Sequence, residues 1–166
     1  MSLTLPAAYS SASKVGNIQE NWIVQLYYDN EGANDWVGIS MADTTVGSVF
    51  YHGVITNVPS IRSSINLVKS TAKTGNVSLN VVNFQYKGDD FSAELLFQGS
   101  RKYINRNVKI YSQLNGDSTL ANCLQVYQGR LIDISHDDAK ITLNITEQRP
   151  WDFITIPQTK TTDSKV

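Results

Sequence analysis

Residues 123–151 constrain the fold of this chain more than any other stretch of its sequence. Near the end of this stretch, Ile141, Leu143 and Ile145 alternate with polar residues. Such an alternation is the period of a β-strand that buries one of its two faces. A second apolar-rich run lies just upstream, at 124–135. We therefore expect the sheet to be built on a long antiparallel hairpin.

A few residues predict the details of this hairpin. Ile132 and Ile134 are spaced to lie on one face of the first strand, and Gly129 interrupts the apolar pattern. A glycine inside a strand marks a β-bulge or a close approach of another backbone. Residues 135–139 combine a serine, a histidine and two aspartates, which favours a reversal of the chain. The sequence thus predicts an irregularity near Gly129 and a turn at 135–139.

The other strand-like runs are separated by polar turns, and they lie at 21–28, 36–40, 49–58, 61–67, 77–81 and 108–112. One short helix is predicted at about 90–98. Asp90 can cap this helix, and Phe91 and Leu95 share one of its faces. The predicted fold class is mainly β, an antiparallel β-barrel or sandwich with one short α-helix.

The chain has 166 residues, which fits one domain. Residues 1–19 are small and polar and predict a flexible N-terminal arm. Residues 20–157 carry the predicted strands, and 158–166 predict a polar linker or tail. Because neither end can form a core of its own, we expect both to be ordered only against neighbouring molecules.

The balance of charges and of apolar residues excludes several classes of protein. The chain has 14 Lys and Arg residues against 15 Asp and Glu, so no basic field predicts sequence-specific binding of nucleic acid. No apolar run approaches the roughly 18 residues of a membrane span, and the N-terminus lacks the pattern of a signal peptide. Charged residues make up 17% of the chain, below the usual value of about 25%. A surface rich in uncharged polar groups suits a protein that packs against other subunits.

Residues that hold metals or act as nucleophiles are scarce. Cys123 is the single cysteine, and its strand-like surroundings predict a buried, inert thiol. Neither His52 nor His136 has further ligands at a spacing typical of zinc sites. The acidic loop 29–35 offers oxygen ligands for Ca²⁺, but its spacing does not match an EF-hand, and a turn between strands explains it better. We expect no cofactor and no metal site.

One pair of carboxylates leaves an enzymatic hypothesis open. Asp133 and Glu147 fall on the two strands of the hairpin and could meet, as catalytic carboxylates do at about 5 to 10 Å. Solvated surface carboxylates explain the two residues as well. A loose basic group follows the predicted helix, at Arg101, Lys102, Arg106 and Lys109. Ion pairs at a rim explain this group better than a phosphate site does, so we expect a protein that is not an enzyme.

Aromatic residues exceed what one small core needs, so some of them are expected on the surface. Tyrosine and tryptophan are enriched at protein interfaces and also form the platforms on which sugars stack. The candidate interface or platform residues are Trp22, Trp36, Tyr51, Tyr103 and Trp151.

The order of the motifs adds a resemblance. In chain order they are the strand at 21–28, VFYHGVI at 49–55, the strand at 76–83, the helix at 91–97, NVKIY at 107–111, VYQGRLIDIS at 126–135, ITL at 141–143 and RPW at 149–151. This series resembles the N-terminal part of tail-tip or baseplate hub proteins of tailed bacteriophages, over roughly 20–151.

The resemblance implies a tail-tube-like β domain at 20–157 in a structural virion protein of a phage tail. Its subunits would form a trimeric or hexameric ring that joins the tail tube to the tip or baseplate. The implied partners are further copies of the chain and other phage tail proteins, and the implied location is the virion tail, after synthesis in the host cytoplasm. No catalytic residue is carried over. A hub, a distal tail subunit and a fragment of a longer protein all remain open.

Two further expectations concern assembly and binding. A mainly β fold leaves edge strands that aggregate unless they are covered, and a ring of subunits pairing edge to edge would cover them. The competing hypothesis is a carbohydrate-binding β-sandwich module that recognises a receptor. In that case Trp22, Trp36 or Tyr51 would serve as exposed sugar platforms.

Overall fold

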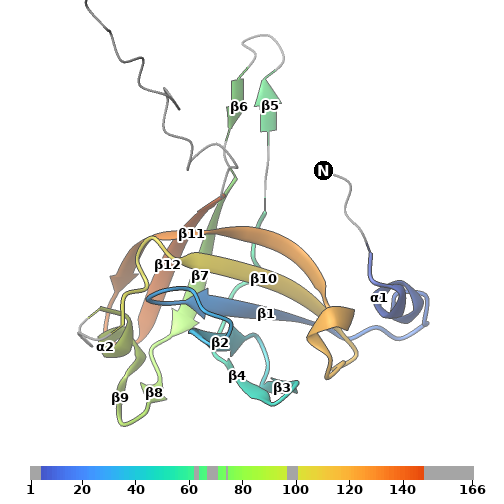
Figure 1. The fold of residues 1–166 in the computed structure, drawn as a ribbon, viewed down its shortest axis with the longest axis horizontal. Helices are drawn as coiled ribbons and strands as arrows, with labels where there is room; N and C mark the ends of the chain where they lie inside the picture. Colours follow the sequence, from blue (N-terminus) through green and yellow to red (C-terminus); the bar gives the residue numbers. More distant parts are fainter. Residues whose placement is uncertain (1–4, 62–63, 67–70, 74, 97–100, 148–166) are drawn as a thin grey trace, which may run out of the picture.

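The computed structural model describes residues 5–61, 64–66, 71–73, 75–96 and 101–147. Its fold is mainly β, as the sequence predicts, and its main feature is a large, strongly curled sheet (Figure 1). The fold is sandwich-like, and the described strands do not form a closed barrel. Trp151 and the predicted tail at 158–166 lie outside the described residues.

Eight strands form the large sheet, in the order β3-β4-β2-β1-β10-β11-β12-β7. Their bounds are β1 Glu20–Tyr27, β2 Trp36–Ser40, β3 Thr44–Val46, β4 Val49–Gly53, β7 Asn76–Val82, β10 Asn107–Leu114, β11 Leu124–His136 and β12 Lys140–Glu147. All neighbouring strands are antiparallel except β2 and β4, which are parallel. The sheet is therefore mixed, with its one parallel pair near the β3 side.

The predicted hairpin is present as β11 and β12, and it lies in the middle of one half of the sheet. Ile141, Leu143 and Ile145 are all fully buried, which confirms the face assigned to the second strand. The turn forms as predicted, because the Asp137 carboxylate accepts hydrogen bonds from the backbone N–H groups of Ala139 and Lys140. These bonds also hold the pKa of Asp137 below its usual value.

The irregularity of β11 lies a few residues from the predicted position. The register of β11 on β12 shifts between Leu131 and Asp133, and Ile132 turns outward with 49% of its surface exposed. The expectation that Ile132 and Ile134 share a face is therefore wrong, because the extra residue of the bulge reverses the alternation. Gly129 marks a close approach instead. A Cβ there would lie 2.7 Å from the Tyr127 ring and against the Thr146 carbonyl.

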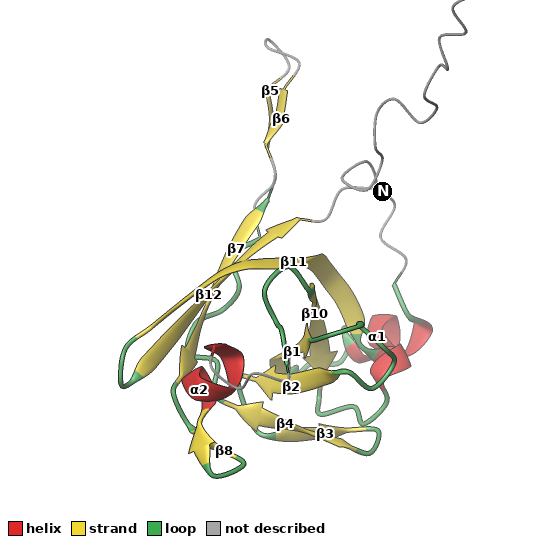
Figure 2. Ribbon diagram, turned by 60° about the vertical axis from the view of Figure 1, so that its left-hand side comes forward, coloured by secondary structure: helices red, strands yellow, loops and turns green. Residues whose placement is uncertain are grey.

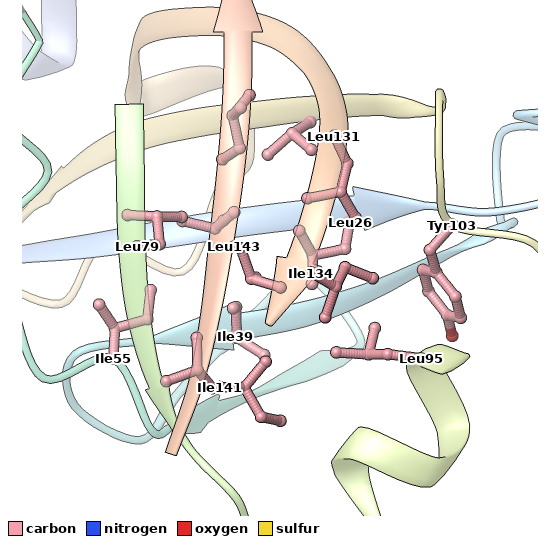
Figure 3. Packing of buried hydrophobic residues seen from close by; sticks show 14 of the residues in the cluster. Leu26, Ile39, Ile55, Leu79, Leu95, Tyr103, Leu131, Ile134, Ile141 and Leu143 are labelled. Carbon is pink, nitrogen blue, oxygen red and sulfur yellow. The ribbon is translucent and has the colours of Figure 1, made fainter. Parts of the chain in front are cut away.

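Both faces of the sheet are covered around β1, as its sequence predicts. Val24 and Leu26 join the larger core cluster, inside the curl of the sheet, together with residues of β7, β11 and β12 (Figure 3). Ile23 faces the other way and joins a smaller cluster with Val46 and Tyr51. The four consecutive residues 23–26 are all buried, so β1 forms the wall between the two clusters.

The outer edge of β7 is covered by the chain itself. Ile55 forms an isolated bridge with Val81, and the segment 54–57 hydrogen-bonds along β7. The backbone bonds run from Thr56 N to the Asn80 carbonyl and from Val82 N to the Val54 carbonyl, both 2.9 Å. The side chain of Asn57 bonds the backbone at Ser78 and Asn80. A ring made by edge-to-edge pairing at β7 would have to displace these bonds.

The described chain has two α-helices where the sequence predicts one. α2, Phe91–Leu96, lies within the predicted 90–98, of which 97 and 98 fall outside the described residues, and it buries Phe91 and Leu95 against the core. α1, Ala7–Ala12, lies within the predicted arm and has no buried residue. Pro6 starts this turn of helix, because its carbonyl accepts a hydrogen bond from Ser10 N at 2.9 Å. A single 3₁₀ turn, η1, spans Leu120–Asn122.

Two small hairpins lie outside the large sheet. β5 (Ser64–Asn66) pairs with β6 (Thr71–Lys73), and both ribbon views show this hairpin standing away from the rest of the molecule (Figures 1 and 2). β8 (Gln85–Tyr86) pairs with β9 (Asp89–Asp90) immediately before α2. The turn between β8 and β9 has positive φ angles at Lys87 and Gly88, which is the geometry of a tight two-residue hairpin.

Candidate functional site

Metal-binding groups are not gathered in the described part of the chain. Its His, Cys, Asp and Glu residues form no cluster of three or more that could hold a metal ion. No helix within the described ranges is long and apolar enough to cross a membrane.

The structure separates the two carboxylates of the enzymatic hypothesis. Asp133 lies opposite Asn144 and accepts a hydrogen bond from its Nδ2 at 3.2 Å. Glu147 lies opposite Gly129, and its carboxylate accepts a bond from Gly75 N at 3.3 Å. Asp133 and Glu147 occupy different register positions of the hairpin, so they do not lie opposite each other as the enzymatic hypothesis would need.

The acidic loop after β1 is a turn, as the sequence favours. Asp35 accepts a hydrogen bond from Gly32 N at 3.2 Å, which closes the loop on itself. Asp29 accepts one from Lys102 N at 3.0 Å, which ties the loop to the segment before β10. These carboxylates organise backbone N–H groups, and this role explains the acidic composition without a bound ion.

Cys123 is buried, as predicted, with 4% of its surface exposed. Burial raises the pKa of its thiol to about 11, so the thiolate form that would act as a nucleophile is scarce near neutral pH.

The basic group contributes an ion pair, in line with the sequence interpretation. Arg101 donates to the Glu94 carboxylate at 2.8 Å, and its guanidinium also lies 4.6 Å from the centre of the Tyr28 ring. Lys109 lies 5.0 Å from the centre of the Tyr27 ring. Two members of the group are thus held against rings or a carboxylate of the subunit itself.

Two of the predicted platform residues are buried, which corrects the expectation that they face outward. Tyr51 is 1% exposed; its ring packs over Gly38, and its hydroxyl accepts a hydrogen bond from Gln25 Nε2 at 2.9 Å. Burial raises the pKa of Tyr51 to about 12. Gly38 permits this packing, because a Cβ there would lie 2.7 Å from the Tyr51 ring. The absence of a side chain at Gly38 therefore makes room for the Tyr51 ring.

Tyr103 is likewise 1% exposed and lies beside Leu95 of α2 in Figure 3.

 Tyr103 and Leu95 both belong to the larger core cluster. The hydroxyl of Tyr103 donates to the Glu94 carboxylate at 2.8 Å, next to the bond from Arg101. Burial and this carboxylate both raise the pKa of Tyr103. The residue therefore anchors α2 to the body of the protein and offers no surface ring.

The two remaining candidates within the described ranges are half-buried. Trp36 stacks at a tilt on Tyr51, with 5.6 Å between ring centres, and its Nε1 donates to the Ala33 carbonyl at 2.9 Å. Trp22 packs against the larger core cluster. Each ring is held by the subunit on one side and reaches solvent on the other. Their role as an interface or a platform remains a prediction.

A set of aromatic residues that the sequence analysis did not single out forms a more exposed surface. We call Phe50, His52, Phe84 and Tyr86 the aromatic strip. Its rings follow each other at centre distances of 5.1 Å from Phe50 to His52, 5.0 Å from His52 to Phe84, and 6.0 Å from Phe84 to Tyr86. Phe84 continues inward to the fully buried Phe91, 4.8 Å away.

The aromatic strip is the place where the core reaches the surface. His52 lies opposite the buried Ile39 in the β2–β4 pair, so it faces the same side of the sheet as the larger core cluster. Exposure rises along the strip, from the half-buried Phe84 and Tyr86 to Phe50, which is 49% exposed. The alternation of Phe50 and His52 in β4 was a sequence signal for this face. Their approach to Phe84 depends on contacts between distant segments.

A second exposed apolar set lies in the N-terminal arm. We call residues 5–19 the apolar arm, because Leu5, Val15 and Ile18 are 52%, 55% and 46% exposed. Its α1 contacts β10 and η1 without burying any residue. The Tyr9 hydroxyl and the Ser112 hydroxyl form a hydrogen bond of 2.9 Å across this contact. The arm is thus held to its own subunit by a small contact.

Comparison with known proteins identifies a shared fold. Neither a protein-family model nor a curated protein sequence matches the chain. Its fold matches solved structures, among them a chain from the virion of a native gene transfer agent particle, with a TM-score of 0.55 and 11% sequence identity. The match covers 86% of this chain and 44% of the other chain, so this chain spans less than half the length of its structural neighbour. At this level of identity, the similarity is one of fold.

Proposed function

We propose that this protein is a structural subunit of a phage-like virion tail. In this proposal, copies of the chain form a ring of three or six subunits that joins the tail tube to the tip or baseplate. The observation that carries the proposal is the fold shared with a chain of a gene transfer agent virion over 86% of this chain. The order of motifs in the sequence supports the same assignment independently.

Features of the subunit itself support assembly. The β5–β6 hairpin pairs with itself and stands away from the large sheet (Figure 2). A two-stranded hairpin of this kind is marginally stable in water, so a neighbouring molecule would stabilise it. The aromatic strip and the apolar arm add exposed apolar side chains at two further places. Aromatic residues are enriched in the buried centres of protein interfaces.

A structural role also fits the chemistry of the described residues. Asp133 and Glu147 lie at separate register positions, and Cys123 is a buried thiol. The Glu94 carboxylate binds partners within the subunit. We therefore propose a protein that acts by assembly and without catalysis.

Carbohydrate recognition is the weaker candidate. Of its three proposed platforms, Tyr51 is buried beneath Trp36, and Trp22 packs against the core. Trp22 and Trp36 are both half-buried, and Trp36 follows a polar loop. A glycan-binding screen of the purified chain, with Trp36→Ala as the matched variant, separates this alternative from the structural proposal.

Electron microscopy tests the proposal. The purified chain, imaged by negative stain, should give rings with three-fold or six-fold symmetry. Antibodies against the chain should label intact particles at the junction between the tail tube and the tip. Labelling of the head alone, or of no part of the particle, would contradict the proposed position.

A further inference from the structure

We propose that neighbouring copies of this chain join head to tail, with the apolar arm of one copy seated on the aromatic strip of the next. This inference rests on the ring proposed above and names one contact that would build it. It needs a receiving surface, a segment able to leave its own subunit, and an arrangement of the two that favours contact between copies.

The aromatic strip has the properties of a receiving surface. Phe50 is 49% exposed at its outer end, while Phe84 rests on the buried Phe91 at its inner end. The strip is therefore supported from below by the core and is open to solvent at Phe50, while the Lys87 ammonium lies 5.0 Å from the centre of the Tyr86 ring. Val49, 37% exposed, precedes Phe50 in β4 and extends the apolar surface toward the edge of the sheet. A partner seated here would complete a core that the subunit leaves open.

The apolar arm has the properties of the segment that is received. Leu5, Val15 and Ile18 are each about half exposed, so the subunit leaves most of their apolar surface in water. The helix α1 buries no residue on its own subunit. Moving α1 to a neighbour would break the hydrogen bond between Tyr9 and Ser112, whereas the two bonds between Gln19 and Asn115 can keep the base of the arm on its own subunit. The gain would be the burial of its apolar side chains.

The positions of the two surfaces favour a contact between two copies. The arm joins the sheet at Glu20, and α1 lies at the opposite end of the molecule from α2 and β8 (Figures 1 and 2). Phe84 and Tyr86 of the strip lie directly before β8 and within it. A contact between two different surfaces of identical subunits is heterologous, and such contacts generate rings when the rotation closes. This is the geometry that a ring needs.

The charges beside the two surfaces are complementary. Lys14 is the only charged residue of the apolar arm. The strip is bordered by the exposed carboxylates Asp43, Asp89 and Asp90, with Lys87 as the basic residue of the β8–β9 turn. A cationic arm would therefore approach an end of the neighbour that carries more acidic than basic groups. Such complementarity sets orientation and the rate of association.

Photo-crosslinking of the full chain locates the contact. A photoreactive phenylalanine analogue replaces Phe50, and the protein is prepared as a mixture of ¹⁴N-labelled and ¹⁵N-labelled copies. After irradiation, mass spectrometry should find crosslinks from position 50 to residues 5–19, with one peptide from each isotope. Crosslinks from position 50 to any other segment of a second copy would overturn the inference, as would crosslinks to the arm within one copy.

Matched substitutions separate this inference from the ring itself. Phe50→Ser and the double variant Val15→Ser with Ile18→Ser should each weaken self-association by tenfold or more. Ile132→Ser is the control, because Ile132 is also 49% exposed but lies on β11, outside both surfaces; it should change association less than twofold. Circular dichroism checks that each variant folds.

The outcomes distinguish the two proposals. If the unmodified chain assembles and both sets of variants assemble equally well, the arm-to-strip contact is wrong and the ring stands. If the unmodified chain remains a monomer at every concentration, both proposals fail. If Phe50→Ser weakens assembly while the arm variant does not, the strip receives some other part of the neighbour, and the inference is again overturned.

Discussion

Strands β12 and β4 belong to the same sheet but differ in how completely their neighbours cover them. β12 lies between two long strands, and its inward residues Ile141, Leu143 and Ile145 are fully buried. β4 lies between the three-residue β3 and a parallel pairing with β2 that involves Ile39 and Ser40. Its Phe50 is 49% exposed. The β12 side closes the core of the subunit, whereas the β4 side leaves part of it exposed.

This difference assigns separate roles to the two regions. Side chains on the β12 side contribute to stability whether or not a partner is present. In the aromatic strip, Phe84 and Tyr86 pack against the core of the subunit, whereas the proposed contact would bury Phe50 only in an assembly. The following predictions test this division, from the largest expected effect to the smallest.

The largest effect is expected on the β12 side. Leu143→Ala should lower the free energy of unfolding by about 2–5 kcal/mol, the range for large-to-small changes in a packed core. Phe50→Ala should lower it by less than about 1 kcal/mol in the monomer, because half of the Phe50 surface is already in water. Urea unfolding of both variants measures the contrast. Equal losses would mean that the two sides of the sheet are equally closed.

A smaller effect is expected where α2 is anchored to the body. Tyr103→Phe removes the donor to the Glu94 carboxylate and should cost about 1–3 kcal/mol, the range for hydrogen bonds to charged groups. Glu94→Gln, which keeps the shape, should cost less in the Tyr103→Phe background than in the unmodified chain, because the two residues share one bond. Thermal unfolding of the four proteins measures the coupling. Additive losses would show that the bond contributes nothing.

The next prediction concerns alkaline pH and Tyr51. Burial raises the pKa of this hydroxyl from 10.0 to about 12 in the folded protein. The unfolded chain therefore loses this proton first as the pH rises, so the stability due to the neutral hydroxyl is complete below about pH 10 and is lost between pH 10 and 12. The loss is at most about 1.4 kcal/mol per pH unit for one group.

Tyr51→Phe provides the control for this prediction, because it keeps the ring over Gly38 and removes the ionisable group. The variant should lose stability less steeply between pH 10 and 12 than the unmodified chain does. Urea unfolding at a series of pH values measures the two slopes. Identical slopes would mean that Tyr51 ionises at its ordinary pKa and is not enclosed.

The smallest effect is a chemical one at Cys123. Its buried thiol, with a pKa raised to about 11, should react with a thiol reagent at pH 8 at least about a hundredfold more slowly than the unfolded chain does. Absorbance of the released chromophore follows the reaction in buffer and in urea. Rapid labelling of the native chain would show that the smaller core cluster opens easily.

Much of the closed region could be predicted from the sequence, and much of the open region could not. The alternation of Ile141, Leu143 and Ile145 identifies their face because a strand has a period of two. The sequence predicts an irregularity near Gly129 but not the position of the bulge at Ile132, because the alternation on either side does not show where an extra residue lies. A bulge is set by how the strand must bend over its neighbours.

The aromatic residues illustrate the same limit. Sequence composition predicts that some rings are exposed, but it does not say which. Tyr51 is buried because Gly38, thirteen positions earlier, leaves room for its ring. Phe84 and Tyr86 lie in a polar segment that resembles a loop, and only contacts with β4 and α2 bring them into the aromatic strip. The local alternation of polar and apolar residues does not predict such contacts between distant segments.

Self-association of the purified chain tests the central claim most directly. Native mass spectrometry or sedimentation over a concentration series measures the mass of the particle without any label. We predict a discrete species of three or six subunits that persists at micromolar concentration, since obligate interfaces bury on the order of 2,000 Å² or more. A folded chain that remains a monomer across the whole series would contradict the account.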